Sequence, residues 1–336
     1  MSADPLIDVH THVVPEDFPA YLGRVAGAPW PGMVPAHACH RHVMISGNVY
    51  RTVSHQCWSC RVRLADMDAQ GVSRQVLSPM PELLSPWLEP EDGRTLARFL
   101  NDTLAAMVAE APARFVALGA VPLQDVAMAI EELDRLLHVT GLAGVELPSH
   151  VNGRPLGDAQ LRPFFEAAAE WGAAIFVHPL RPADLHRLVG PPALEQVLAF
   201  PGEIGLAGAS LVTSGLLAAL PGLRIALSHG GGTLAALLPR LRHARGCMPP
   251  VRDLLPADPL DDARRLWIDD LVYDAATLRH LVATFGADRV MAGTDYPFVI
   301  MESDPAGAIE AGGFDEATRR ALRAGNARRW LGLEDA

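Results

Sequence analysis

The sequence predicts an α/β fold, specifically a (β/α)8 TIM barrel with a long inserted segment after its first strand. Three observations support this prediction. Eight short apolar or β-branched runs occur along the 336 residues, amphipathic stretches follow most of them, and no linker divides the chain. Strands that alternate with helices pair in parallel through right-handed crossovers, and eight such units suit a closed barrel. The same alternation also allows an open, doubly wound sheet.

The expected strands, in order, are Leu6–His10, Ser73–Ser78, Phe115–Val121, Ala143–Leu147, Ala174–His178, Arg224–Ser228, Leu266–Tyr273 and Arg289–Gly293. Helical patterns include Arg94–Glu110, Ala127–His138, Leu161–Glu170 and Ala275–Phe285. The uncharged stretch Ile204–Leu223 is long enough to span a membrane, but its glycine and polar residues favour a buried helix. We expect residues 1–336 to form one barrel domain, in which the Pro-, Gly- and His-rich segment 13–66 covers the site.

The composition restricts the classes of function. The chain has 39 acidic and 28 basic residues and a formal net charge of −11, which disfavours nucleic acids and anionic membranes as partners. All 28 basic residues are arginine, which excludes a lysine Schiff base, a P-loop lysine and a carbamylated lysine that bridges two metals. Four cysteines are too few for a disulfide framework, and no signal peptide is evident, so we expect a cytoplasmic protein.

Residues that can bind a metal stand at the carboxyl ends of several expected strands. His10 and His12 end the first strand, and their side chains share one side because strand residues alternate. His178 ends the fifth strand, His229 follows the sixth, and Asp295 follows the eighth. Barrel active sites form at this end of the strands. Any one of these residues could be an unrelated capping residue, but the five together predict one site.

The types of donor predict one Zn²⁺, or a similar divalent ion, held by three histidines and one aspartate. Such an ion lowers the pKa of bound water and makes hydroxide available near neutral pH. The fourth histidine could then serve as the general base. His229 is the natural candidate, because the flexible residues Gly230–Gly232 leave space for a substrate beside it.

Motifs distributed over nearly the whole chain resemble those of one family. They are Ile7–His12, Asp66–Val72, Val121–Asp125, Gly144–Asn152, Phe176–Pro179, Ser228–Gly232 and Gly293–Phe298. Together they resemble the metal-dependent decarboxylase branch of the amidohydrolase superfamily. The resemblance implies a zinc-dependent, non-oxidative decarboxylase of a small unsaturated or aromatic carboxylic acid, with no organic cofactor. A hydrolase or hydratase of the same superfamily, acting on a ring-cleavage product or an aromatic acid, is the alternative. A non-catalytic binding protein is disfavoured because no ligand and no base is missing.

The resemblance also implies a role for each residue. The zinc ligands would be His10, His12, His178 and Asp295, and His229 would deprotonate the water on the metal. Arg51 resembles the arginine that binds the substrate carboxylate, and Phe298 would line the pocket. Arg240 resembles a second arginine that reaches in from a neighbouring subunit, so the resemblance implies a homodimer.

One feature departs from the family pattern, and one segment is unusual in composition. Leu180 and Arg181 follow His178 and Pro179, where the family pattern has a tryptophan. Arg181 would lie at the mouth of the site, where it either serves a differently placed carboxylate or faces solvent, so the exact substrate stays open. The His- and Cys-rich segment 37–60 is compatible with a structural zinc site, a redox-active Cys57–Cys60 pair or an ordinary covering loop.

Overall fold

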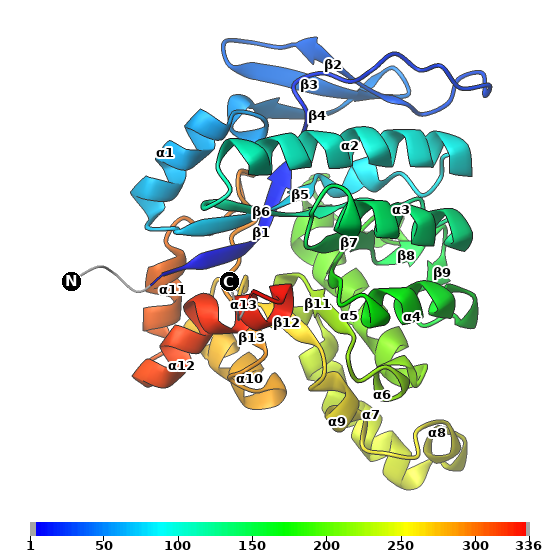
Figure 1. Ribbon diagram of the computed structural model, residues 1–336. Coiled ribbons are helices and arrows are strands. Elements are labelled where there is room, and N and C mark those ends of the chain that lie inside the picture. The colour runs from blue at the N-terminus through cyan, green and yellow to red at the C-terminus, as the bar shows by residue number, and fades with distance from the viewer. Residues whose placement is uncertain (1–4, 334–336) are drawn as a thin grey trace.

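A computed structural model, which describes residues 5–333, confirms the predicted barrel (Figure 1). Its eight strands are β1 (Ile7–Val13), β5 (Arg74–Pro79), β6 (Phe115–Gly119), β7 (Gly144–Pro148), β10 (Ala174–His178), β11 (Arg224–Leu227), β12 (Trp267–Asp269) and β13 (Val290–Met291). They are neighbours in this order, and each pair is parallel. The carboxyl ends of all eight strands therefore meet at one end of the barrel.

The barrel nearly closes between its last strand and its first. The backbone N–H of Val9 donates to the carbonyl of Ala292 at 2.9 Å. Beyond β13, the N–H of Asp295 donates to His10, and the N–H of His12 donates to Tyr296, both at 2.8 Å. An open, doubly wound sheet has no such bonds between its edge strands, so this alternative is excluded.

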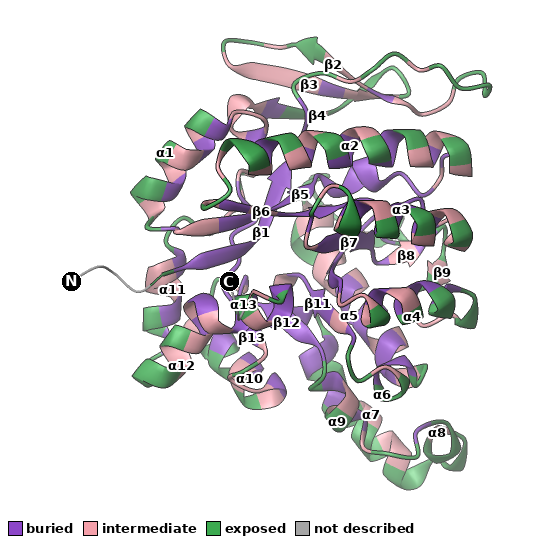
Figure 2. Ribbon diagram, in the orientation of Figure 1, coloured by how far each residue is buried: buried purple, intermediate pink, exposed green. Residues whose placement is uncertain are grey.

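Helices surround the barrel, and Figure 2 shows their exposed faces turned away from the buried strands. They are α1 (Cys60–Gln70), α2 (Pro90–Glu110), α3 (Val126–His138), α4 (Arg162–Glu170), α5 (Phe200–Thr213), α6 (Leu216–Ala219), α7 (Leu234–Cys247), α8 (Pro249–Leu254), α9 (Pro259–Ala263), α10 (Ala275–Phe285), α11 (Pro305–Ala311), α12 (Glu316–Arg320) and α13 (Asn326–Leu331). The apolar stretch 204–223 forms two helices, α5 and α6, separated at Gly215. Within residues 5–333, no helix is long and apolar enough to cross a membrane.

Two hydrophobic clusters support the barrel. The larger one lies between the strands and the surrounding helices, as expected for strands that are buried on both faces. The smaller one includes Val9, Phe176 and Trp330. The ring of Phe176 lies 5.0 Å from that of His10 and 6.1 Å from that of Trp330 in α13, measured between centroids. Apolar packing thus supports the histidines of β1 from within the barrel.

The segment inserted after β1 forms a separate antiparallel sheet, which the sequence did not predict. The sheet consists of β2 (Pro31–Pro35), β3 (His40–Ile45) and β4 (Asn48–Ser54) and lies beyond α2 at the top of Figure 1. A short hairpin, β8 (His150–Val151) and β9 (Arg154–Pro155), follows β7. Buried Val43 and Val53 of the inserted sheet belong to the same hydrophobic cluster as Leu96 and Leu100 of α2. This packing fixes β4, which carries Arg51, over the barrel.

Candidate metal centre

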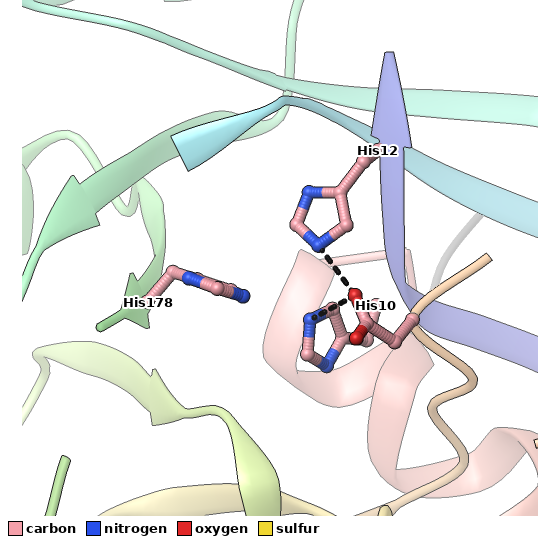
Figure 3. Close-up of side chains that lie close together, drawn as sticks. His10, His12 and His178 are labelled. Carbon is pink, nitrogen blue, oxygen red and sulfur yellow. Dashed lines mark ion pairs between the residues drawn. The ribbon is translucent and has the colours of Figure 1, made fainter. Parts of the chain in front are cut away.

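Four residues predicted from strand ends come together at the carboxyl end of the barrel. One possible ligand atom from each of His10, His12, His178 and Asp295 lies within 4.8 Å of the other three, and all four residues are buried. Figure 3 shows the three labelled imidazoles gathered around one small volume, and their ring centroids are 5.0 to 5.2 Å apart. Within residues 5–333, no other group of three or more histidine, cysteine or acidic side chains is arranged to hold a metal.

The outer nitrogen of each imidazole has a hydrogen-bond partner. Nδ1 of His10 lies 2.7 Å from Oδ2 of Asp269. The Nδ1 atoms of His178 and His12 face backbone carbonyl oxygens at 3.0 and 3.4 Å. These bonds place the proton on Nδ1 and leave Nε2 of each ring as the potential ligand atom, which is the arrangement found around protein-bound metals.

The inner atoms of the cluster face one another and have no partner elsewhere in the described chain. Nε2 of His10, His12 and His178 and Oδ1 of Asp295 are all buried, and Oδ1 of Asp295 lies 2.9 Å from Nε2 of His12 and 3.6 Å from Nε2 of His10 (Figure 3). Buried polar atoms that lack partners outside such a cluster are costly, and a divalent cation would satisfy all four at once. Three imidazole nitrogens and one carboxylate oxygen are a suitable donor set for Zn²⁺ or a similar ion. The residues present therefore fit a metal.

The electrostatics of His178 and Asp295 favour the protonation states that bind metals. Burial and the neighbouring imidazoles hold the pKa of His178 well below its usual range, so this ring is neutral. Burial opposes ionisation of Asp295, but the hydrogen bond with His12 and the charges of His10 and His12 keep the pKa of its carboxyl group below the usual value. Neutral imidazoles and an ionised carboxylate are the forms that coordinate a metal.

His229 lies beside the cluster but is not one of its ligands. Its ring centroid is 5.2 Å from those of His10 and His178. Burial lowers the pKa of His229 to about 4, so the imidazole is neutral near pH 7 and can accept a proton. The backbone N–H groups of His229 and Gly230 both donate to the carboxylate of Asp269, at 3.0 and 2.6 Å.

Asp269 is a functional residue that the sequence analysis missed. It ends β12 and is fully buried. The expected strand Leu266–Tyr273 extended beyond Asp269, so this residue did not look like a strand end. With the observed bounds of β12, Asp269 stands at the carboxyl end of a strand, as His178 does.

Strained backbone is concentrated around this centre. Arg181, His229, Tyr273 and Asp295 have φ angles of 43°, 52°, 57° and 64°, in the left-handed region that non-glycine residues rarely adopt. All four residues line one cavity. Strain of this kind persists only where the surrounding structure enforces it, and it is typical of functional sites.

The cavity beside the metal cluster has a volume of about 670 Å³, which suits a small organic ligand. Its lining includes the predicted site residues Arg51, His178, Arg181, His229, Asp295 and Phe298. The guanidinium carbon of Arg51 lies 4.3 Å from the ring centroid of Phe298, and that ring stacks on His12 at 5.0 Å. Arg51 forms no ion pair within residues 5–333, so its positive charge remains available near the cluster.

The two other predicted arginines are placed differently. Arg181 lines the cavity and forms an ion pair with Glu82. Arg240 lies on the exposed surface of α7 and does not line the cavity of its own chain. Its contribution across a subunit interface stays a prediction.

The His- and Cys-rich segment does not form a second metal site within the described chain. All four cysteines are free thiols. Burial raises the pKa of Cys57 to about 12 and that of Cys60 to about 11, whereas a reactive pair requires a lowered pKa. Of the three interpretations of this segment, the structure favours the covering loop.

Comparisons with known proteins agree with this geometry. The Amidohydrolase family model matches residues 7–333. The chain is 34% identical to the 2-amino-3-carboxymuconate-6-semialdehyde decarboxylase of Dictyostelium discoideum, over 98% of this chain and 92% of that protein. The crystal structure of 5-carboxyvanillate decarboxylase LigW from Sphingomonas paucimobilis shares 29% identity with a TM-score of 0.74, over 81% of this chain and 82% of that one. A dihydroxybenzoic acid decarboxylase from Polaromonas, solved with bound manganese and an inhibitor, shares 26% identity with a TM-score of 0.70, over 82% and 86%.

The chain therefore belongs to the amidohydrolase family, in its branch of metal-dependent decarboxylases. Its nearly closed barrel and its buried cluster of three histidines and one aspartate are those that the sequence motifs implied.

Proposed function

We propose that this protein is a zinc-dependent, non-oxidative decarboxylase of a small unsaturated or aromatic carboxylic acid. The observation that carries the proposal is the buried donor cluster, whose four inner atoms have no partner in the described chain outside the cluster, beside His229 in a cavity with an unpaired arginine. Relatives named as decarboxylases of a carboxymuconate semialdehyde and of aromatic acids support this class of substrate.

His10, His12, His178 and Asp295 would hold the metal. When bound, the metal supplies Lewis-acid chemistry, which polarises the substrate and activates water. We propose Zn²⁺ because three imidazoles and one carboxylate suit it, although the Polaromonas relative was solved with manganese. Elemental analysis of protein purified without added metal tests this assignment, and a content of one manganese per chain would contradict it.

The residues of the chain bind the acid and handle one proton. Arg51 binds a substrate carboxylate, and Phe298 contacts an apolar face of the molecule. Loss of carbon dioxide leaves an electron pair on the substrate carbon, and that carbon must take up a proton. His229, neutral and beside the cluster, relays this proton from water to the carbon. The pair of electrons from the broken bond then forms the new C–H bond, without an oxidant.

We further propose that the enzyme is a homodimer in which Arg240 completes the neighbour's site. Arg240 lies outside its own cavity on exposed α7. Leu237 on the same helix and Leu206 on α5, which packs against it, leave 39% and 63% of their surface exposed. Exposed apolar side chains on adjacent helices are compatible with a subunit interface.

Carbon dioxide release from freshly prepared 2-amino-3-carboxymuconate-6-semialdehyde and from 2,6-dihydroxybenzoate tests the proposed reaction. We expect release by the metal-loaded wild type and a loss of about 100- to 10,000-fold in His229→Gln with the metal retained. His243→Gln, which changes an exposed histidine of α7, is the matched control and keeps full activity.

Product analysis separates decarboxylation from the hydrolase or hydratase alternative, which would use the same donor set. A product that has gained water and kept its carboxylate would contradict decarboxylation. Retention of full activity in His229→Gln would contradict the role of His229.

A further inference from the structure

An ion pair in the cavity wall, between a buried carboxylate and an arginine that is 48% exposed, has no part in the proposed chemistry. Glu82 lies in the short 3-10 turn Pro81–Leu84 that follows β5, and its side chain is only 6% exposed. Its Oε1 atom accepts two hydrogen bonds from Arg181, from Nε at 3.2 Å and from Nη2 at 2.5 Å. Both residues line the cavity. We refer to Glu82 and Arg181 as the wall pair.

Only one oxygen of the Glu82 carboxylate is engaged in these bonds. Oε2 accepts no hydrogen bond within the described chain. An ionised carboxylate has about four acceptor sites, so a buried carboxylate with one free oxygen can accept a further bond from a donor in the cavity. Burial raises the pKa of Glu82, and the hydrogen bonds and charge of Arg181 make this rise smaller.

Two further features restrict the position of Arg181. Its guanidinium carbon lies 3.1 Å from the ring centroid of Trp87, which is a stacking contact. Its backbone has a φ of 43°, in the strained left-handed region. Swinging Arg181 towards a ligand would leave the Glu82 carboxylate buried and unpaired, which is strongly unfavourable. The charge of Arg181 is therefore committed to Glu82 and is not available to a substrate carboxylate.

The charges near the wall pair are unfavourable for a second carboxylate. The charges that act most strongly on Glu82 are those of Arg181, Glu195 and Arg51, and none of these residues belongs to the metal cluster. Glu82, Glu195 and Arg181 all line the cavity. When both carboxylates are ionised, these three side chains have a net charge of −1. Arg51, with its guanidinium over Phe298, is the unpaired cation nearer to the cluster. A carboxylate is thus favoured at Arg51, whereas a hydrogen-bond donor is favoured at Glu82.

We propose that the wall pair determines substrate specificity. Glu82 accepts a hydrogen bond from an amino or hydroxyl group of the substrate, and Arg181 holds that carboxylate in place. The selected substrate is then an acid that carries such a donor on the part of the molecule directed towards Glu82, rather than a further carboxylate. This inference rests on the proposed function, because it concerns the substrate of the same cavity.

The binding of four matched acids to the metal-loaded protein tests the proposal by calorimetry. 3-Aminobenzoate and 3-hydroxybenzoate carry a donor, 3-methylbenzoate carries an apolar group of similar size, and isophthalate carries a second carboxylate. We expect the wild type to bind the two donor acids about 10- to 100-fold more tightly than the other two. Glu82→Gln weakens this preference, and the double variant Glu82→Leu with Arg181→Met abolishes it without leaving a lone buried charge.

Glu166→Gln is the matched control, because it removes the carboxylate of an exposed ion pair, with Arg162 on α4, and should leave the preference unchanged. Tightest binding of isophthalate to the wild type, or an unchanged donor preference in both wall-pair variants, would overturn the proposal. Carbon dioxide release measured on the same proteins tests the proposed reaction separately from the wall-pair proposal. Turnover without donor preference overturns only the wall-pair proposal, whereas donor preference without turnover of any acid overturns only the proposed reaction.

Discussion

At the scale of single residues, Asp269 connects the metal cluster to the proposed base. Its carboxylate contacts Nδ1 of His10 at 2.7 Å and accepts the backbone N–H groups of His229, Gly230 and Leu271 at 3.0, 2.6 and 3.3 Å. One side chain therefore sets the orientation of a ligand ring and the path of the backbone that carries His229. Partners of this kind orient the metal ligands and strengthen metal binding.

We expect Asp269→Asn to lower metal affinity by about 10- to 100-fold, because the amide cannot hold the His10 ring as the carboxylate does. Competition with a chromophoric chelator measures this change. Asp274→Asn is the control, since exposed Asp274 caps α10 and its loss should lower stability by at most about 1 kcal/mol without changing metal affinity. Equal metal affinities for the wild type and Asp269→Asn would contradict the role of Asp269.

The site residues differ in how readily the sequence reveals them. His178 and Asp295 could be predicted because each ends or directly follows an apolar run, and His10 and His12 because alternation places them on one side. Glu82 could not be predicted in this way, because its partner Arg181 is 99 residues away and only the folded barrel brings the two together. Local patterns reveal residues that a strand positions, but not pairs that tertiary structure creates.

At the scale of elements, the turn that carries His229 depends on its last glycine. A Cβ atom on Gly232 would lie 2.0 Å from the carbonyl oxygen of Pro201 in α5, and the φ of Gly232 is 57°. We expect Gly232→Ala to lower the free energy of unfolding by about 2 to 4 kcal/mol, as measured by urea denaturation. Gly202→Ala changes a glycine of the same α5 whose Cβ would meet nothing within 4 Å, so it should be neutral or stabilise by up to about 1 kcal/mol. Equal stabilities of the two variants would contradict this account of the turn.

The inserted sheet serves the site through β4, which places Arg51 over Phe298. We expect Arg51→Met to raise the dissociation constant for 3-hydroxybenzoate by about 10- to 100-fold, because a charge-assisted hydrogen bond to the carboxylate is lost. Arg41→Met on neighbouring β3 is the control, since Arg41 pairs with the exposed Glu16 instead. Unchanged affinity in Arg51→Met would contradict its proposed function.

The sequence predicts the barrel elements more closely than it predicts the insertion. The helix expected over Ala275–Phe285 has these same bounds as α10, because an apolar period of 3.6 residues and the capping Asp274 mark it. The strands of the insertion are largely half-exposed, and β2 begins and ends with proline. Such strands lack the regular apolar alternation by which strands are recognised, so the segment was predicted only as a covering connection.

At the scale of the whole molecule, one chain provides the metal cluster, His229 and Arg51 but leaves Arg240 outside its own cavity. If the partner subunit supplies Arg240, each site of a symmetric dimer is built from both chains. Arg240→Ala would then remove activity from the neighbour's site, whereas His229→Gln would remove activity from its own.

A dimer with one Arg240→Ala subunit and one His229→Gln subunit shows whether the Arg240 of each site comes from the partner subunit or from the same subunit. In this heterodimer, the site of the Arg240→Ala subunit keeps its own His229 and receives an intact Arg240 from its partner. We therefore expect co-expressed, differently tagged and doubly purified heterodimers to recover about half of the wild-type rate of carbon dioxide release, while both homodimeric variants stay nearly inactive. If Arg240 served its own site, each subunit of the heterodimer would lack one essential group and no activity would return. A monomeric wild type in sedimentation analysis, or full activity of the Arg240→Ala homodimer, would contradict the shared site.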